Sequence, residues 1–184
     1  ESVKQGEWNR NDHPGVMLKG KQLGIVGCGR IGQWMARYAS AFDMAVVGND
    51  PFLTTWPDNI RQVSLESLLS DSDFVTVHVP LNAESRGLLG YEELALMKHG
   101  AILVNTSRGE ILHQSALLEQ LRCGKLSAGL DVVTGEPDIQ GNPLVEYARK
   151  HDNLIVTPHI GGYCPEALLV VLTDCCERIN EFSA

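Results

Sequence analysis

The sequence has 184 residues, of which 43% are hydrophobic and 21% are charged, and its formal net charge is −8. This length and composition fit one well-packed globular domain. The negative charge argues against a nucleic-acid surface, because phosphate binding needs clustered lysine and arginine. No apolar run reaches the length of a membrane span and no signal peptide is recognisable, so we expect a cytoplasmic protein that does not bind membranes.

Short β-branched runs alternate with longer amphipathic segments along the chain. Six strands are predicted, at Leu23–Val26, Met44–Gly48, Phe74–Val79, Ile102–Asn105, Leu126–Asp131 and Leu154–Val156. Helices are predicted between them, at Ile31–Ala41, Leu65–Ser70, Tyr91–Lys98, Ser115–Arg122 and, more briefly, within Pro143–Lys150. This alternation implies right-handed βαβ units. We therefore expect an α/β fold with a Rossmann-type doubly wound parallel sheet, in three layers α/β/α.

The two ends of the chain differ from this central region, residues 20–162. Residues 1–19 are polar and rich in Asn, Asp, Pro and Gly, which predicts an arm without regular structure. Cys164–Phe182 carries apolar residues at helical spacing. We expect a final helix that docks on the sheet or on something outside this sequence.

A polar or glycine-containing feature follows every predicted strand. In chain order these features are Gly27–Gly32, Asn49–Asp50, His78, Ser107–Gly109, Asp131 and Pro158–His159. Ligands of open α/β sheets bind beyond the carboxyl ends of the strands. The sequence therefore predicts one binding site along this edge.

The stretch from Gly27 to Gly32 has the GxGxxG spacing of a dinucleotide-binding turn. It follows a strand and opens a helix, whose N-terminus supplies amide donors for a pyrophosphate. Asp50 lies 18 positions after Gly32, close to the spacing of a carboxylate that binds ribose hydroxyls. That carboxylate would repel a 2′-phosphate and so favours NAD over NADP. The alternative for Asp50 is a turn residue before Pro51.

Three further residues suggest chemistry on a bound substrate. Arg108 could hold a carboxylate bidentately, or it could be an exposed salt-bridge arginine. His159, within TPHIGG, suits proton transfer, although a hydrogen-bonded loop histidine is the alternative. Glu136 could orient that histidine and favour its protonated form. The other histidines are predicted to be structural or exposed, except that His78 could line the cofactor pocket.

The five cysteines form no CxxC pair and have no metal-ligand spacing. Their odd number also argues against a closed disulfide framework. We expect reduced thiols and no metal site.

Five blocks in order resemble the D-isomer-specific 2-hydroxyacid dehydrogenases: LKGKQLGIVGCGRIG, HVPLN, ILVNTSRGEI, AGLDVVTGEP and NLIVTPHIGG. The resemblance implies that Arg108, Glu136 and His159 form the catalytic trio of an NAD-dependent oxidoreductase that is similar to D-3-phosphoglycerate dehydrogenase. It also implies that Asp50 binds the adenosine ribose and that Asp131 lies near the nicotinamide amide. The whole implied cofactor set is Gly27, Gly29, Arg30, Ile31, Gly32, Asp50, His78, Val79, Pro80, Thr106, Asp131, His159 and Gly161.

The substrate implied by this resemblance is a small 2-hydroxy or 2-keto acid, whose identity the sequence does not specify. Members of the family carry a substrate-binding domain built mainly from residues before the dinucleotide domain. Residues 1–19 would then be a remnant of the interdomain linker, and residues 163–184 a helix returning to that domain. Tyr163 would contact the substrate or that domain, or pack locally. The resemblance further implies that the protein forms a homodimer and that this domain alone does not turn over substrate. The alternative function is an NAD(H)-sensing protein like the corepressors that share this fold.

Overall fold

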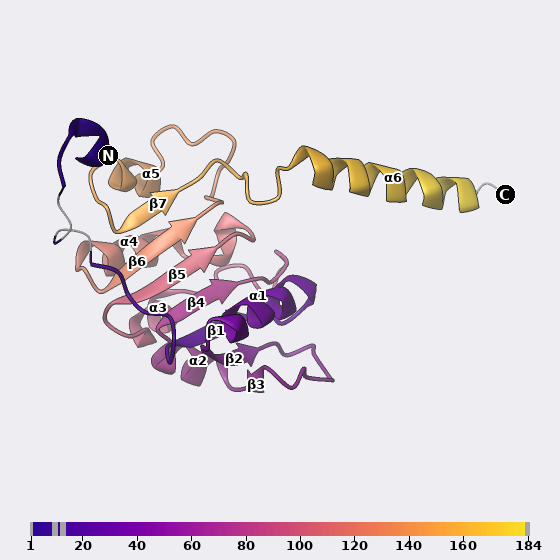
Figure 1. Cartoon of the computed structure of the whole chain (residues 1–184), viewed down its shortest axis with the longest axis horizontal. Coiled ribbons are helices and arrows are strands. Elements are labelled where there is room, and N and C mark those ends of the chain that lie inside the picture. Colours follow the sequence, from indigo (N-terminus) through magenta and orange to yellow (C-terminus); the bar gives the residue numbers. More distant parts are fainter. Residues whose placement is uncertain (1, 9–10, 12–13, 183–184) are drawn as a thin grey trace.

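The computed structural model describes residues 2–8, 11 and 14–182, and its centre is one parallel sheet (Figure 1). Seven strands pair in the order β3-β2-β1-β4-β5-β6-β7. Their bounds are β1 Gln22–Val26, β2 Ala45–Asn49, β3 Arg61–Gln62, β4 Phe74–Val77, β5 Ala101–Asn105, β6 Leu126–Leu130 and β7 Leu154–Val156. The chain starts in the middle of the sheet, winds to one edge and then crosses to the other, which is the doubly wound topology. The predicted fold is confirmed.

The sequence pattern predicted every strand except β3. That strand has two residues, both exposed, and pairs only with β2 at the edge of the sheet. It buries no apolar side chain, so it leaves no hydrophobic pattern to detect.

Five α-helices of the described chain flank the sheet, α1 Arg30–Ala41, α2 Leu65–Asp71, α3 Tyr91–Leu96, α4 Gln114–Arg122 and α5 Pro143–Ala148, and a sixth, α6 Pro165–Phe182, follows β7. Two 3₁₀ turns, η1 Ser2–Gln5 and η3 Gly109–Ile111, complete the regular structure that we describe. The prediction of no regular structure in residues 1–19 is therefore wrong for Ser2–Gln5, which form one short turn. Local chemistry sets the helix starts. The Ser64 hydroxyl caps α2, and the Asn142 side chain caps α5, whose first residue is a proline.

The two faces of the sheet are covered unequally. Helix α1 packs on β1 and β2 on one face, and α2 to α5 form a continuous layer on the other. The larger core lies under that layer and includes Leu68, Leu103 and Leu117, which are fully buried. On the α1 side, Ile102 and Val104 of β5 are half-buried and Ile155 of β7 is 66% exposed. The β5–β7 half of that face is therefore only partly covered.

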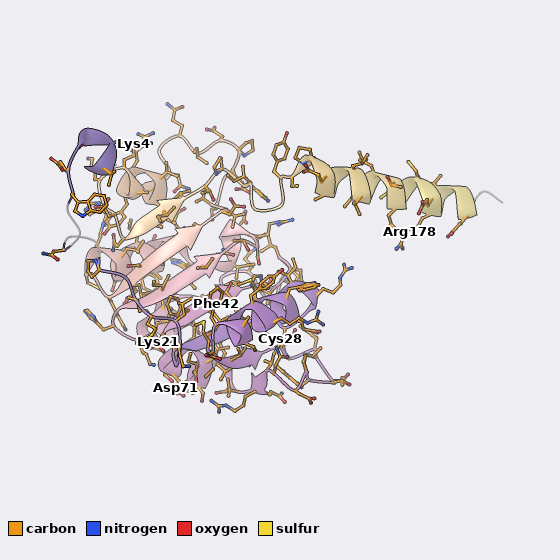
Figure 2. All side chains as sticks on the ribbon, in the orientation of Figure 1. Lys4, Lys21, Cys28, Phe42, Asp71 and Arg178 are labelled. Carbon is orange, nitrogen blue, oxygen red and sulfur yellow. The ribbon has the colours of Figure 1, made fainter. Side chains whose placement is uncertain are left out.

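Helix α6 forms as predicted, but it extends away from the sheet (Figure 1). Its apolar residues Leu168, Leu169, Val170, Val171, Leu172 and Ile179 are all exposed. A polar contact within the helix joins Arg178, labelled in Figure 2, to Asp174 at 2.9 Å. Docking on the sheet, one of the two expected arrangements, is therefore not observed.

Parts of the predicted end segments, residues 1, 9–10, 12–13 and 183–184, lie outside the described residues. Within the described part of the chain, no helix combines the length and apolarity needed to cross a membrane.

Candidate active site

The glycine loop joins β1 to α1 in a backbone path that side chains would block. Gly27 has φ +90°, and a Cβ there would lie 2.7 Å from the Val79 side chain. A Cβ at Gly32 would come closer than 3.0 Å to the Gly27 carbonyl oxygen. Gly29 is the N-cap of α1, so no side chain caps the helix, and its missing Cβ faces open space. The α1 N-terminus is thus accessible to an anionic ligand.

Asp50 lies beside this loop at the end of β2. One carboxylate oxygen accepts a hydrogen bond from the Cys28 amide at 2.9 Å, and the other from the Phe52 amide at 3.0 Å. The bond to Phe52 is that of a turn-forming aspartate. The turn role and the position expected of a ribose-binding carboxylate therefore coincide in one side chain.

A cavity of about 630 Å³ opens between the glycine loop and the end of β4. Its walls include Gly27, Gly29, Asp50, His78, Val79 and Pro80, six residues of the expected cofactor set. Arg30, Ile31 and Gly32 form the first turn of α1 beside it. Thr106, Asp131, His159 and Gly161 lie at the ends of β5, β6 and β7 and do not line this cavity. An open glycine cradle, an uncapped helix and an adjacent carboxylate fit a dinucleotide.

The cavity also has walls that sequence reasoning missed. Phe52 and the Asn82–Ser85 turn line it together with Leu88. In that turn, the Asn82 side chain accepts hydrogen bonds from the amides of Glu84 and Ser85. The turn follows β4 at the same edge as His78, a position that could have drawn attention to it.

Two titratable groups in this region are held uncharged. Burial lowers the pKa of His78, whose Nε2 lies 2.9 Å from the Thr76 hydroxyl. Burial and the neighbouring Asp50 raise the pKa of the Cys28 thiol to about 12. Cys28 is therefore an inert buried thiol at neutral pH, whereas the other four cysteines are exposed.

Arg108 lies in a turn that a buried side chain organises. Asn105 is fully buried at the end of β5. Its side-chain Nδ2 donates to the Arg108 carbonyl at 2.8 Å, and its Oδ1 accepts from the Ser107 backbone amide at 3.0 Å. The Arg108 side chain is exposed, and its Nη1 donates to the Ser107 carbonyl at 2.6 Å. The remaining guanidinium N–H groups have no partner among the described residues, so they can donate hydrogen bonds to a bound anion.

The Arg108 turn packs directly on the loop that follows β6. A Cβ at Gly109 would come closer than 3.0 Å to the backbone of Val133 and Thr134. Only glycine permits this approach. The contact brings the loop of Arg108 against the loop that carries Glu136.

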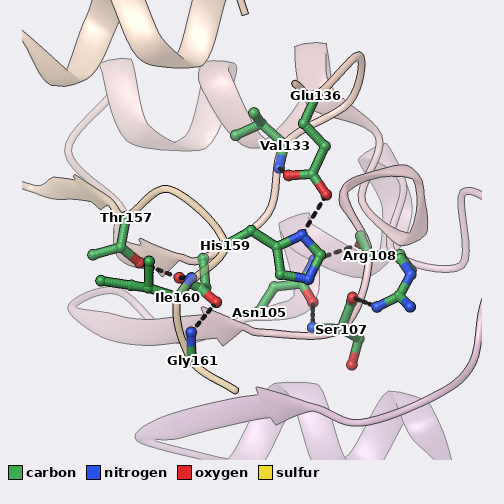
Figure 3. A network of polar contacts seen from close by, with 10 residues as sticks. Asn105, Ser107, Arg108, Val133, Glu136, Thr157, His159, Ile160 and Gly161 are labelled. Carbon is green, nitrogen blue, oxygen red and sulfur yellow. Dashed lines mark hydrogen bonds and ion pairs between the residues drawn. The ribbon is translucent and has the colours of Figure 1, made fainter. Parts of the chain in front are cut away.

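Glu136 and His159, 23 positions apart in the sequence, are hydrogen-bonded. His159 Nδ1 lies 2.7 Å from Glu136 Oε1, and the side chains are 49% and 30% exposed. The second Glu136 oxygen accepts a longer bond, of 3.4 Å, from the Val133 amide. Figure 3 shows Arg108, Glu136 and His159 in one region, with the imidazole between the other two in this view. The structure thus gathers the three predicted catalytic side chains from three loops at one edge of the sheet.

The imidazole–carboxylate pair also borders a second cavity, of about 760 Å³. Apart from this pair, its walls are mostly apolar and come from β7, α5 and the loop before α5; they include Ile139, Val145 and Val156. The pair thus lies at the border of a mostly apolar cavity.

Comparison with known proteins identifies the family. Residues 1–161 match the family described as "D-isomer specific 2-hydroxyacid dehydrogenase, NAD binding domain". The chain belongs to this family. The resemblance found in the sequence blocks is therefore confirmed.

The relatives of this 2-hydroxyacid dehydrogenase domain are longer proteins. It is 40% identical to the D-3-phosphoglycerate dehydrogenase of Methanocaldococcus jannaschii over 98% of this chain, which is 34% of that protein. It is also 40% identical to the hydroxypyruvate reductase of Thermotoga maritima over 97% of this chain and 58% of that protein. The chain thus spans between a third and three fifths of these relatives.

Solved structures agree with the fold. A D-2-hydroxyisocaproate dehydrogenase superposes with a TM-score of 0.91 at 26% identity, covering all of this chain and 59% of that one. The D-lactate dehydrogenase of Aquifex aeolicus, solved with NAD and lactic acid, gives a TM-score of 0.85 at 30% identity, over 98% of this chain and 59% of that one.

Proposed function

We propose that this domain binds NAD(H) for an oxidoreductase that interconverts small 2-hydroxy and 2-keto acids. The observation that carries the proposal is the 2.7 Å contact between His159 and Glu136, beside Arg108, at the carboxyl edge of a family NAD-binding domain. A carboxylate-held imidazole is a proton donor and acceptor, and a nearby guanidinium binds carboxylates. Reduction of a 2-keto acid requires both functions: a proton donor for its carbonyl oxygen and a cation that binds its carboxylate.

In the proposed reaction, NAD(H) held at the glycine loop and Asp50 would supply the hydride chemistry in either direction. Because His159 uses Nδ1 for Glu136, its Nε2 remains to give a proton to the carbonyl oxygen or take one from the hydroxyl. Glu136 orients the ring through this bond. Arg108 holds the substrate carboxylate and so fixes the reacting carbon beside the imidazole.

The proposed cofactor site spans the whole carboxyl edge. Gly27, Gly29 and the first turn of α1, Arg30 to Gly32, would hold the pyrophosphate, and Asp50 the adenosine ribose. His78, Val79, Pro80 and Thr106 would line the path towards Asp131, His159 and Gly161, which would surround the nicotinamide end.

The domain assignment also becomes a proposal about the complete enzyme. We propose that residues 20–162 form the NAD-binding domain, that residues 1–19 belong to a linker, and that residues 163–184 return to a substrate-binding domain outside this sequence. The exposed apolar residues of α6 support this role for the helix. We also propose a homodimer through this domain. Trp34 and Tyr38 of α1 and Phe42, directly after it, support this proposal, since they are 52%, 54% and 59% exposed.

The choice of cofactor provides a direct test on this chain. In calorimetric titrations we expect NADH to bind roughly tenfold or more tightly than NADPH, because Asp50 would face the 2′-phosphate of NADPH. Asp50→Asn removes the charge and should narrow this preference. Asp58→Asn, an exposed acid in the same loop region that does not line the cavity, is the matched control. An equal or stronger affinity for NADPH in the unaltered protein would contradict the role of Asp50.

A further inference from the structure

We propose that Asp131 is the positioning residue for His159: its carboxylate holds the loop Thr157–Gly161 in the conformation that places the imidazole against Glu136. The inference rests on the proposed function for its catalytic consequence, but its structural part stands on contacts within this chain. It assigns Asp131 a task beyond the expected position near the nicotinamide.

The loop has a backbone conformation that needs outside support. His159 has φ +52°, in the left-handed region that residues other than glycine adopt rarely. Such a conformation persists only where its surroundings determine it. The imidazole is 49% exposed, so packing around the ring is not sufficient to do so.

Asp131 supplies this support on both sides of His159. Before it in the sequence, the Thr157 hydroxyl donates to Asp131 Oδ1 at 2.5 Å. After it, the amides of Ile160 and Gly161 donate to Oδ1 and Oδ2 at 2.9 and 2.7 Å. The His159 amide donates to the Asp131 main-chain carbonyl at 2.9 Å. Figure 3 shows Thr157, Ile160 and Gly161 gathered on one side of the His159 ring, away from Glu136.

The chemistry of the group fits this task. Asp131 is 6% exposed, and no lysine or arginine of the described chain forms an ion pair with it. Burial opposes its ionisation, yet hydrogen bonds from Thr157, Gly161 and Ile160 and the proximity of His159 hold its pKa below the usual 3.8. A carboxylate can accept all three bonds, whereas an asparagine amide would turn a donor towards one of these donors.

Holding the loop fixes the proton on the ring. With its backbone held, His159 keeps Nδ1 at 2.7 Å from Glu136 Oε1. In the neutral ring the proton then resides on Nδ1, because a carboxylate only accepts, and Nε2 is left as the proton acceptor. If the loop relaxes, this preference between the two ring nitrogens is lost.

The test is long-range ¹H–¹⁵N NMR of the histidine rings in this chain, at a pH where the His159 ring is neutral. We expect His159 to be protonated at Nδ1 in the unaltered protein, and Asp131→Asn to abolish that preference. Thr157→Val, which deletes one hydroxyl donor, should weaken it, and Thr157→Ser, which keeps the hydroxyl, should restore it. Backbone amide spectra report whether each variant folds.

A folded Asp131→Asn protein with unchanged His159 ring shifts would overturn the proposal. If Asp131→Asn does not fold, the threonine pair decides, and identical ring shifts in Thr157→Val and Thr157→Ser overturn it. Titration of Asp131→Asn with ADP-ribose and with NADH adds a second test. If only the affinity for NADH falls and the His159 ring shifts are unchanged, Asp131 contacts the nicotinamide and does not position His159.

In the complete enzyme, Asp131→Asn should lower kcat by roughly 10- to 100-fold, the effect of a misplaced acid–base group. Affinity for ADP-ribose should stay within about twofold. If the unaltered enzyme reduces no 2-keto acid, the proposed function fails, while the ring measurement still decides the role of Asp131.

Discussion

Replacing His159 by alanine is expected to lower the turnover of the complete enzyme by roughly 10²- to 10⁴-fold, the range for loss of a general acid–base group. Affinity for NADH should change little, because the glycine loop and Asp50, which we expect to hold most of the cofactor, lie at other strand ends. Arg108→Ala should likewise reduce turnover, together with a raised KM for the keto acid. Steady-state kinetics give kcat and KM, and calorimetry gives the affinity for NADH.

The matched control is His99→Ala. His99 is exposed and precedes β5, so it lies at the opposite edge of the sheet from the proposed site. Its removal should leave both turnover and NADH affinity unchanged. Near-normal turnover in His159→Ala would remove His159 from the mechanism, and a matching fall in NADH affinity would place it in cofactor binding instead.

Gly109→Ala should destabilise the domain and disturb the site together. The added Cβ would overlap the backbone of Val133 and Thr134, which cannot rotate away as a side chain can. Overpacking of this kind costs about 1–3 kcal/mol, which corresponds to a fall in Tm of roughly 2–12 °C for a domain of this size. The displacement would also move the Arg108 turn away from the loop of Glu136. Calorimetric melting measures the first effect, and the KM of the complete enzyme for its keto acid measures the second.

Gly162→Ala tests whether this cost comes from the close approach. Gly162 lies in the loop after His159, and a Cβ there would meet no atom within 4 Å. Its Tm should stay close to that of the unaltered protein. Equal Tm values for Gly109→Ala and Gly162→Ala would show that the contact between the two loops is not as tight as the structure indicates.

Much of this architecture follows from the sequence because it depends on local patterns. β-branched runs mark the buried parallel strands, and amphipathic segments mark α1 and α4. The βαβ alternation with right-handed crossovers predicts a doubly wound sheet. Because all its strands are parallel, their polar ends lie at one edge. Strand β3 could not be predicted, since two exposed residues carry no periodicity.

The geometry of the site was less accessible, because it depends on contacts between loops. Sequence spacing does not fix the distance between Glu136 and His159; it results from the loops after β6 and β7 meeting across the sheet edge. The buried amide of Asn105 and the bonds from the His159 loop to Asp131 are also long-range or side-chain-specific. Asp50 illustrates the same limit: the sequence left a turn role and a ribose-binding role open, and only the structure shows that its two oxygens accept bonds from the Cys28 and Phe52 amides.

A panel of 2-keto acids, given to the complete enzyme with NADH, tests the proposed reaction. Suitable candidates are 3-phosphohydroxypyruvate, hydroxypyruvate, glyoxylate and pyruvate, and the decrease in NADH absorbance reports reduction. We predict that at least one is reduced, and that His159→Ala suppresses the reaction. Saturable NADH binding without reduction of any of them would contradict the proposed reaction and favour an NAD(H)-sensing protein.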